Sequence, residues 1–167
     1  MLDGGFAALR ILSVLLKLLP VMNDPLTNAL DSLPHGPEFR FLDRLLSLEP
    51  GKCGVGEYTV RGDEPFLRGH FPGQPLFPGV LLIEAAAQLA GTVAQSDPQI
   101  PAMPGLKLTA VRGAKILGTA KPGETIRLEA RVAGRLANLV QAHTAAFVGG
   151  NKILEVDLTL SGEAAPG

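Results

Sequence analysis

The chain has 167 residues, 46% of them hydrophobic, which corresponds to about one ordinary domain with enough apolar side chains for a core. Its 15 basic and 16 acidic side chains leave a formal net charge of -1, and it has one tyrosine and no tryptophan, so we expect no nucleic-acid partner. A single cysteine, Cys53, excludes an internal disulfide framework and leaves no cluster with zinc-ligand spacing. These features predict a cytoplasmic protein with one globular domain.

Residues 6–19 form the first predicted element, an α-helix that ends at Pro20. Its polar side chains, Arg10, Ser13 and Lys17, form one stripe on an otherwise apolar surface. Such a helix needs a covering surface, and we favour its own domain or a partner subunit over a membrane surface. No apolar run is long enough to span a bilayer, and the interrupting charges and missing small-residue cleavage site argue against a signal peptide.

Strand patterns begin after residue 37 and predict an antiparallel sheet. Alternation is clearest at Ile126, Leu128, Ala130 and Val132, between which charged side chains point to the other face. Such strands bury one face and expose the other to water. The predicted strands are residues 38–48, 54–60, 106–117, 124–134, 136–148 and 151–160, with turns at Pro50-Gly51, Pro122-Gly123, Gly134-Arg135 and Gly149-Gly150-Asn151.

The only long helix pattern, residues 79–97, lies between the two groups of strands. It starts after Pro78 and ends at the Asp97-Pro98 pair. Its side chains are apolar or small except at Glu84 and Gln88, so we expect a helix that is buried on all sides. About six strands and one buried helix predict an α+β architecture in which the sheet curls around the helix.

Glu84 and Gln88 lie four residues apart, so they share one face of the predicted helix. An ionised carboxylate is costly to bury without partners. Glu84 is therefore either paired structurally or poised as a general acid or base, and the spacing alone leaves both alternatives open.

His70 lies nine residues before the helix, in a loop that three prolines and three glycines shape. Imidazole is the side chain best suited to moving a proton near neutral pH. The Gly79 amide, at the start of the helix, is placed to donate to a carbonyl oxygen that gains charge. A base, an acid and an oxyanion donor together suit proton removal α to a carbonyl.

The stretch "GHFPGQPLFPGVLLIEAAAQLAG", residues 69–91, resembles the signature of the 3-hydroxyacyl-acyl-carrier-protein dehydratases of the FabZ type, which have the hot-dog fold. "LPHGPEFRFLDRLLSLEPG", residues 33–51, resembles the N-terminal hairpin motif of that family. The resemblance implies a sheet of five to six strands around one long central helix. The resemblance covers residues 33–162, the expected hot-dog domain. Together with the helix pattern described above, this divides the chain into an extra N-terminal amphipathic helix with a polar linker (1–32), the hot-dog domain (33–162) and a flexible tail (163–167).

The resemblance further implies an enzyme that eliminates water from a (3R)-3-hydroxyacyl thioester on acyl carrier protein and gives the trans-2-enoyl thioester. His70 would take the α-proton and Glu84, from the opposite subunit of a homodimer or a trimer of dimers, would help the β-hydroxyl leave. Gln88 would orient Glu84. We expect neither a cofactor nor a metal ion. The implied substrate-binding residues are Phe71, Pro78, Gly79, Val80 and Gln88.

The chain departs from the family pattern in places. Related FabA-type dehydratase-isomerases carry Asp where this chain has Glu84, which favours plain dehydration. Residues 114–117 lack the usual aromatic residue and basic-proline pair. Arg112, Lys115 and Lys121 would lie near the tunnel mouth and either meet the acidic carrier protein or form an ordinary solvated edge.

Other interpretations stay open at this stage. His35, in a Pro-Gly turn, and His143, in a strand, are assigned structural positions. A hot-dog thioesterase would use the same fold, and a third alternative is a non-catalytic acyl-binding subunit. The sequence leaves undecided the acyl chain length, a housekeeping or specialised lipid pathway, acyl carrier protein or coenzyme A as carrier, dimer or hexamer, and the role of residues 1–32.

Overall fold

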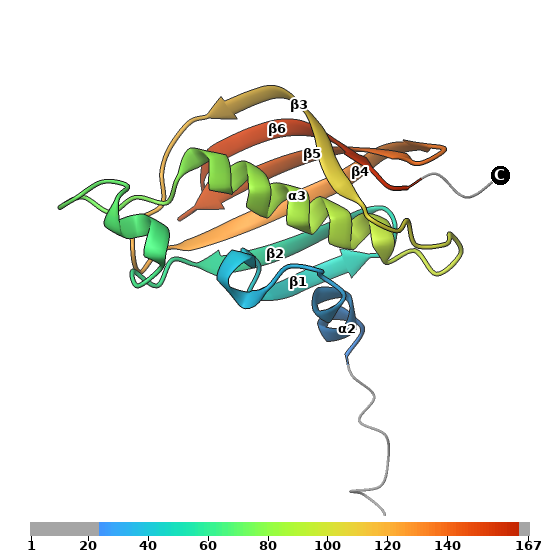
Figure 1. Cartoon of the computed structure of the whole chain (residues 1–167), viewed down its shortest axis with the longest axis horizontal. Helices are drawn as coiled ribbons and strands as arrows, with labels where there is room; N and C mark the ends of the chain where they lie inside the picture. The colour runs from blue at the N-terminus through green and yellow to red at the C-terminus, as the bar shows by residue number, and fades with distance from the viewer. Residues whose placement is uncertain (1–23, 164–167) are drawn as a thin grey trace, which may run out of the picture.

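The computed structural model describes residues 24–163 as six strands, two α-helices and two short 3-10 turns (Figure 1). The strands form one antiparallel sheet in the order β1-β2-β4-β5-β6-β3, and α3 lies across one face of it. The elements are α2 (Pro25–Asp31), η1 (Pro37–Phe39), β1 (Arg44–Glu49), β2 (Cys53–Thr59), η2 (Pro65–Arg68), α3 (Gly79–Gln95), β3 (Lys107–Ile116), β4 (Thr125–Leu136), β5 (Leu139–Val148) and β6 (Asn151–Ser161). The predicted α+β arrangement of a sheet around one long helix is confirmed.

Two predicted segments fall largely outside this range. The helix expected at residues 6–19 and the tail beyond Glu163 lie outside the described residues. Within residues 24–163, no helix is both long and apolar enough to cross a membrane. The segment expected as a polar linker contains α2, which starts with Pro25 in its first turn, a position where the missing N–H of proline costs nothing.

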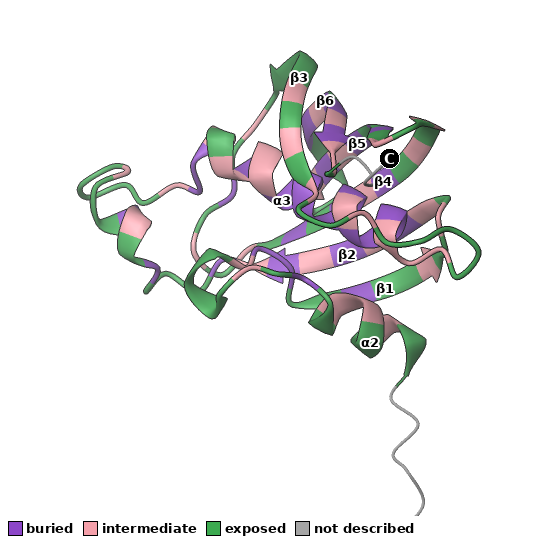
Figure 2. Ribbon diagram, turned by 45° about the vertical axis from the view of Figure 1, so that its right-hand side comes forward, coloured by how far each residue is buried: buried purple, intermediate pink, exposed green. Residues whose placement is uncertain are grey.

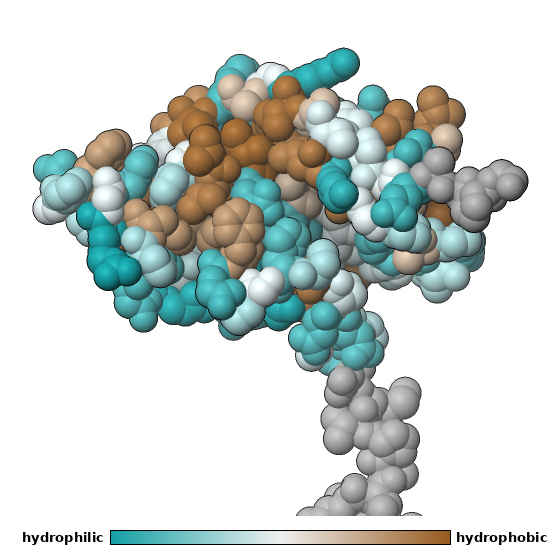
Figure 3. All heavy atoms as spheres, in the orientation of Figure 1, coloured by the Kyte–Doolittle hydropathy of each residue, from teal (hydrophilic) through white to brown (hydrophobic). Residues whose placement is uncertain are grey.

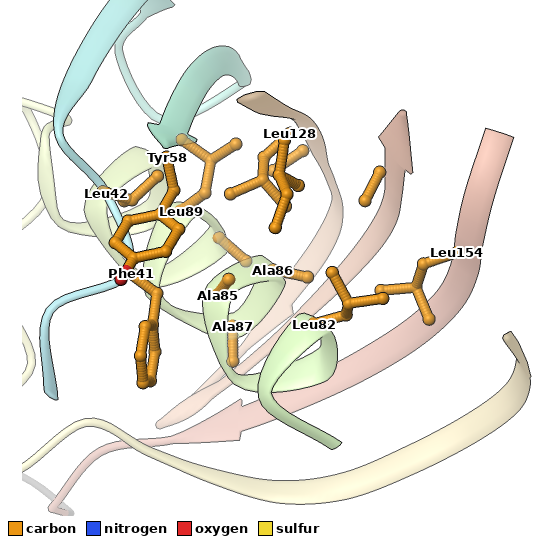
Figure 4. Close-up of a cluster of buried hydrophobic side chains, with 14 of the residues drawn as sticks. Phe41, Leu42, Tyr58, Leu82, Ala85, Ala86, Ala87, Leu89, Leu128 and Leu154 are labelled. Carbon is orange, nitrogen blue, oxygen red and sulfur yellow. The ribbon is translucent and has the colours of Figure 1, made fainter. Parts of the chain in front are cut away.

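The core lies between α3 and the inward face of the sheet. The alternation predicted for β4 is confirmed, because Ile126 and Leu128 are fully buried. Leu82 and Leu89 of α3 are equally inaccessible and lie among side chains from several strands (Figure 4). Full burial of one such side chain stabilises the fold by about 1.5–3 kcal/mol, so this layer determines where the helix sits.

Two glycines of β2 allow close packing, Gly54 against α3 and Gly56 against β1 and the segment before it. A Cβ atom added at Gly54 would come within 2.8 Å of Val93 Cγ2 and 3.3 Å of the Ser47 carbonyl oxygen. At Gly56 it would come within 2.9 Å of Leu42 Cδ2. Both glycines are buried, so any larger side chain here would push the helix or β1 away.

The prediction that α3 is buried on all sides is wrong for its first two turns. Val80 is 70% exposed, and Leu81, Ile83 and Glu84 are partly exposed, whereas the buried residues concentrate further along the helix (Figure 2). The reason is that the sheet of one chain covers only one side of this end of the helix.

The first strand starts later than predicted. Residues 38–48 were expected to be extended throughout, but β1 begins only at Arg44. The backbone before it bonds to the helix instead, since the Phe41 N–H donates to Gln88 Oε1 at 2.8 Å. β1 is an edge strand, and its pairing with β2 shifts between Leu45 and Ser47, as in a β-bulge.

The turn predicted at Gly134-Arg135 is also wrong. β4 continues to Leu136, and Gly134 lies where the pairing with β5 shifts by a residue. The chain reverses instead around Ala137, which has a positive φ of 51°. A glycine inside a strand pattern thus marked a β-bulge rather than the end of the strand.

We expect Gly54→Ala to lower the free energy of unfolding by about 1–3 kcal/mol, because the new methyl group overpacks the contact between β2 and Val93. Urea denaturation at 25 °C measures this. Gly134→Ala is the matched control, because a Cβ there meets nothing within 4 Å and should leave stability unchanged or slightly raised. Equal effects of the two substitutions would contradict the close helix-sheet contact.

Candidate active site

Glu84 and Gln88 meet on one face of α3, as their spacing predicts. Gln88 Nε2 donates to Glu84 Oε1 at 3.0 Å and to the Phe39 carbonyl oxygen at 2.8 Å. Gln88 Oε1 accepts from the Phe41 N–H at 2.8 Å. Gln88 is only 2% exposed, and these contacts engage both its amide oxygen and its amide nitrogen. The amide is therefore fixed, and one oxygen of Glu84 with it.

His35 is a site residue that the sequence analysis missed. Its Nε2 lies 3.3 Å from Glu84 Oε1, although its Pro-Gly turn indicated a structural position. The Gln88 contacts to Phe39 and Phe41 hold the 35–41 segment against α3 and bring the imidazole there. No local spacing joins His35 to the helix, so only the tertiary fold reveals the contact.

The expectation of a buried Glu84 is wrong for the single chain. Its side chain is 24% exposed, and that of His35 is 30% exposed. Glu84 lies in the first turns of α3, which the sheet leaves open, and His35 lies beside it. The carboxylate is thus both paired and accessible, so the two alternatives for Glu84 are not mutually exclusive.

The loop before α3 fixes His70 through the backbone on both sides. The His70 N–H donates to the Leu67 carbonyl oxygen, and its own carbonyl oxygen accepts from the Leu76 N–H at 2.9 Å. Nδ1 lies 3.1 Å from the Leu76 carbonyl oxygen. Because a carbonyl oxygen only accepts, Nδ1 carries the proton and Nε2 keeps a lone pair that is available to a base. Phe71, which is 54% exposed, stacks on the imidazole with ring centroids 4.2 Å apart.

The N-terminus of α3 presents free amide donors. Pro78 occupies the cap position and makes no side-chain capping bond. Within residues 24–163, neither the Gly79 nor the Val80 N–H donates to another group. A Cβ at Gly79 would come within 2.6 Å of Ile116 Cδ1, so the glycine also permits close contact with β3. The partial positive charge of a helix N-terminus favours negative charge at this point.

One chain does not bring His70 and Glu84 together. In the part of the chain that the structure describes, no hydrogen bond or ion pair joins them. The molecule instead carries two half-sites: the helix half-site of His35, Glu84 and Gln88, and the loop half-site of His70 and the Gly79 amide.

A buried carboxylate anchors the start of the loop that carries His70. Glu64 accepts hydrogen bonds from the backbone N–H groups of Arg61 and Gly62 and from the Tyr58 hydroxyl, at 2.7–2.8 Å. Burial alone would raise the pKa of Glu64, but these donors outweigh it and hold that pKa below its ordinary value of 4.5. Burial and the bond to Glu64 also raise the pKa of Tyr58, which keeps its hydroxyl a donor.

The basic residues predicted to face a carrier protein are all exposed, but one of them has an acidic partner. Lys115 Nζ pairs with Glu155 at 2.7 Å, while Arg112 and Lys121 are exposed. Lys115 also lines a hollow of about 760 Å³ on the outer face of the sheet, which contains neither His70 nor Glu84. This hollow is therefore not the site in which the two half-sites meet.

An antiparallel sheet wrapped around one long helix, with a histidine in the loop before that helix and a glutamate on it, defines the hot-dog class of acid-base enzymes. The chain belongs to the FabA-like domain family, whose model matches residues 33–157.

Similar proteins agree with this assignment. A 3-hydroxyacyl-acyl-carrier-protein dehydratase FabZ from Syntrophotalea carbinolica is 37% identical over 131 residues, which cover 75% of this chain and 86% of that protein. The FabZ of Chloroflexus aggregans is 41% identical over 100 residues, which cover 60% and 69% of the two chains. Among solved structures, the dehydratase heterocomplex ApeI:P from Xenorhabdus doucetiae shares the fold, with a TM-score of 0.69 at 16% identity over 83% of this chain and 91% of that one.

We expect Glu64→Gln to destabilise the protein by about 2 kcal/mol at neutral pH, because the backbone donors of the anchor lose a charged acceptor. The folded-state pKa of Glu64 is lowered, so its contribution is present above the ordinary value of 4.5 and is lost as the pH falls through the lowered value. The difference in unfolding free energy between wild type and variant should therefore shrink below pH 4.5, measured by urea denaturation at several pH values. Glu129→Gln, at an exposed ion pair, is the control and should change the unfolding free energy little. A difference between wild type and Glu64→Gln that does not vary with pH would contradict the role of the Glu64 carboxylate as an anchor.

Proposed function

We propose that this protein is a (3R)-3-hydroxyacyl-acyl-carrier-protein dehydratase, a hydro-lyase that works as a homodimer with two shared active sites in the cytoplasm. The observation that carries the proposal is the pair of complementary half-sites in a chain of this family: a loop histidine whose Nε2 has a free lone pair, and a helix carboxylate held by Gln88. The named relatives supply the substrate class.

The chemistry needs one proton taken and one proton given. His70 Nε2 removes the α-proton of the 3-hydroxyacyl thioester, and the Gly79 N–H donates to the thioester oxygen as it gains negative charge. Glu84 of the other subunit gives its proton to the β-hydroxyl, which leaves as water while the double bond forms. Phe71, Pro78 and Val80, which flank these groups, would contact the acyl thioester.

The edge strand β3 supports the homodimer. Among residues 24–163 it pairs only with β6, so within this range its other side offers unpaired backbone N–H and C=O groups along a ten-residue strand. Val111, Ile116 and Val80 are 44%, 51% and 70% exposed, and hydrophobic side chains gather over α3 and β3 in Figure 3. Pairing of two β3 strands would cover this apolar surface and bring each His70 loop toward the helix of the other subunit.

Acyl carrier protein is the proposed carrier of the substrate. Arg112 and Lys121 are exposed and suit an acidic partner, whereas Lys115 already has an acidic neighbour in Glu155. We therefore assign docking to Arg112 and Lys121 ahead of Lys115.

We expect the purified protein to interconvert 3-hydroxyacyl and trans-2-enoyl thioesters of acyl carrier protein, and His70→Ala and Glu84→Gln each to lower kcat by about 10²- to 10⁴-fold. Mass spectrometry of the acyl chain measures both directions. His143→Ala is the control, because this histidine pairs with Asp157 on the outer face of the sheet and should keep full activity. Undiminished turnover in either active-site variant would sink the assigned roles, and free acid as the product would indicate a thioesterase.

Mixing subunits tests the shared site. When His70→Ala and Glu84→Gln chains are refolded or co-expressed together, a mixed dimer has one site with both changes and one site with neither. Each variant alone should be nearly inactive, whereas a random mixture should recover about a quarter of wild-type activity, because half of its dimers are mixed and each has one intact site. Failure of a mixture that demonstrably forms mixed dimers would place both residues in the same subunit's site.

A further inference from the structure

We propose that His35 is a positioning residue that, with Gln88, holds Oε1 of Glu84 and thereby leaves Oε2 as the oxygen that exchanges a proton with the substrate. This inference rests on the proposed dehydratase function and deepens it. It starts from one observation: two nitrogen atoms from different parts of the chain converge on a single carboxylate oxygen, at 3.3 Å from His35 Nε2 and 3.0 Å from Gln88 Nε2.

The burial of the other imidazole nitrogen decides which atom of His35 carries the proton. His35 Nδ1 is buried and has no hydrogen-bond partner among the described residues. A proton on Nδ1 would place an N–H donor in a buried position without an acceptor, which costs more than leaving a lone pair there. The proton therefore belongs on Nε2, which faces Glu84 Oε1 at 3.3 Å.

The geometry of Gln88 excludes a role for the amide oxygen at this point. Its Oε1 is occupied by the Phe41 N–H, and its Nε2 divides its two hydrogens between Glu84 and the Phe39 carbonyl oxygen. Gln88 therefore meets Glu84 only as a donor. With the Gln88 N–H donating to Oε1 and the protonated Nε2 of His35 only 3.3 Å from it, a proton on that oxygen would face two other hydrogens, so a protonated Glu84 carries its hydrogen on Oε2.

This arrangement makes the two carboxylate oxygens of Glu84 inequivalent. In residues 24–163, Oε2 has no hydrogen-bond partner, and the side chain is 24% exposed on the open end of α3. The oxygen that can give a proton to the β-hydroxyl is thus the one that no described residue holds. Without His35, the Gln88 bond alone leaves the carboxyl group free to turn about that contact.

Two substitutions of His35 distinguish the effect of its N–H donor from the effect of its side-chain volume. His35→Leu replaces the imidazole by an apolar side chain of similar reach and so removes the Nε2–H donor. We expect kcat to fall by about 10- to 100-fold with little change in KM. His35→Gln keeps an N–H donor at a distance like that of Nε2, and we expect it to retain most of kcat. His143→Leu is the matched control and should leave both constants unchanged. Thermal unfolding of each variant verifies that it is folded.

Wild-type kcat in His35→Leu would overturn the proposal, and so would an equal loss in the Leu and Gln variants, since the donor would then be irrelevant. A second measurement does not depend on activity: two-bond ¹H–¹⁵N spectra of the full chain with labelled histidines report the tautomer of each ring. We expect the His35 signal, assigned by its loss in His35→Leu, to show the proton on Nε2 and to shift in Glu84→Gln. A proton on Nδ1 would refute the contact. Absence of dehydratase turnover in the wild type would instead refute the proposed function and leave this spectral test to decide the contact.

Discussion

The hydrogen bonds of one buried amide, Gln88, connect the packing of this protein to its proposed chemistry. Gln88 is 2% exposed in the middle of α3, so its polar atoms need partners that water does not supply. It finds them in the backbone at Phe39 and Phe41 and in Glu84. The same bonds delay the start of β1, hold the 35–41 segment on the helix and carry His35 to the carboxylate. Removal of this amide would therefore disturb the fold of the N-terminal segment and the helix half-site together.

The open end of α3 is the second organising feature, and it follows from the size of the sheet. Six strands cover the later turns of the helix, where Leu89 and Val93 are fully buried, but leave Val80 largely exposed. Glu84 lies at the boundary between these regions, which is why it is both hydrogen-bonded and accessible. The loop half-site, which includes the Gly79 amide, and the edge strand β3 adjoin the same open end. In the proposed homodimer, a second chain would complete an active site from these parts.

The sequence predicts those features of the fold and the site that depend on residues close together in the chain. The alternation of Ile126 and Leu128 predicted the buried face of β4, and the four-residue spacing of Glu84 and Gln88 predicted their contact. Contacts between distant segments were not visible: Phe41 bonds to a side chain 47 positions later, and no periodicity encodes that pairing. His35 was assigned a structural position for the same reason. The turn near Ala137 was misplaced because a glycine in a bulge and a glycine in a turn look alike in the sequence.

The two edges of the sheet differ in a way that bears on how far the protein can polymerise. β3 has ten residues, whereas β1 has only six and has α2 beside it (Figure 1). Short edge strands, and edges covered by a helix, resist the addition of another strand. Joining of two chains through β3 therefore leaves only β1 edges at both ends of the combined sheet. In the proposed homodimer, the combined sheet would close at two copies and offer no template for fibre growth.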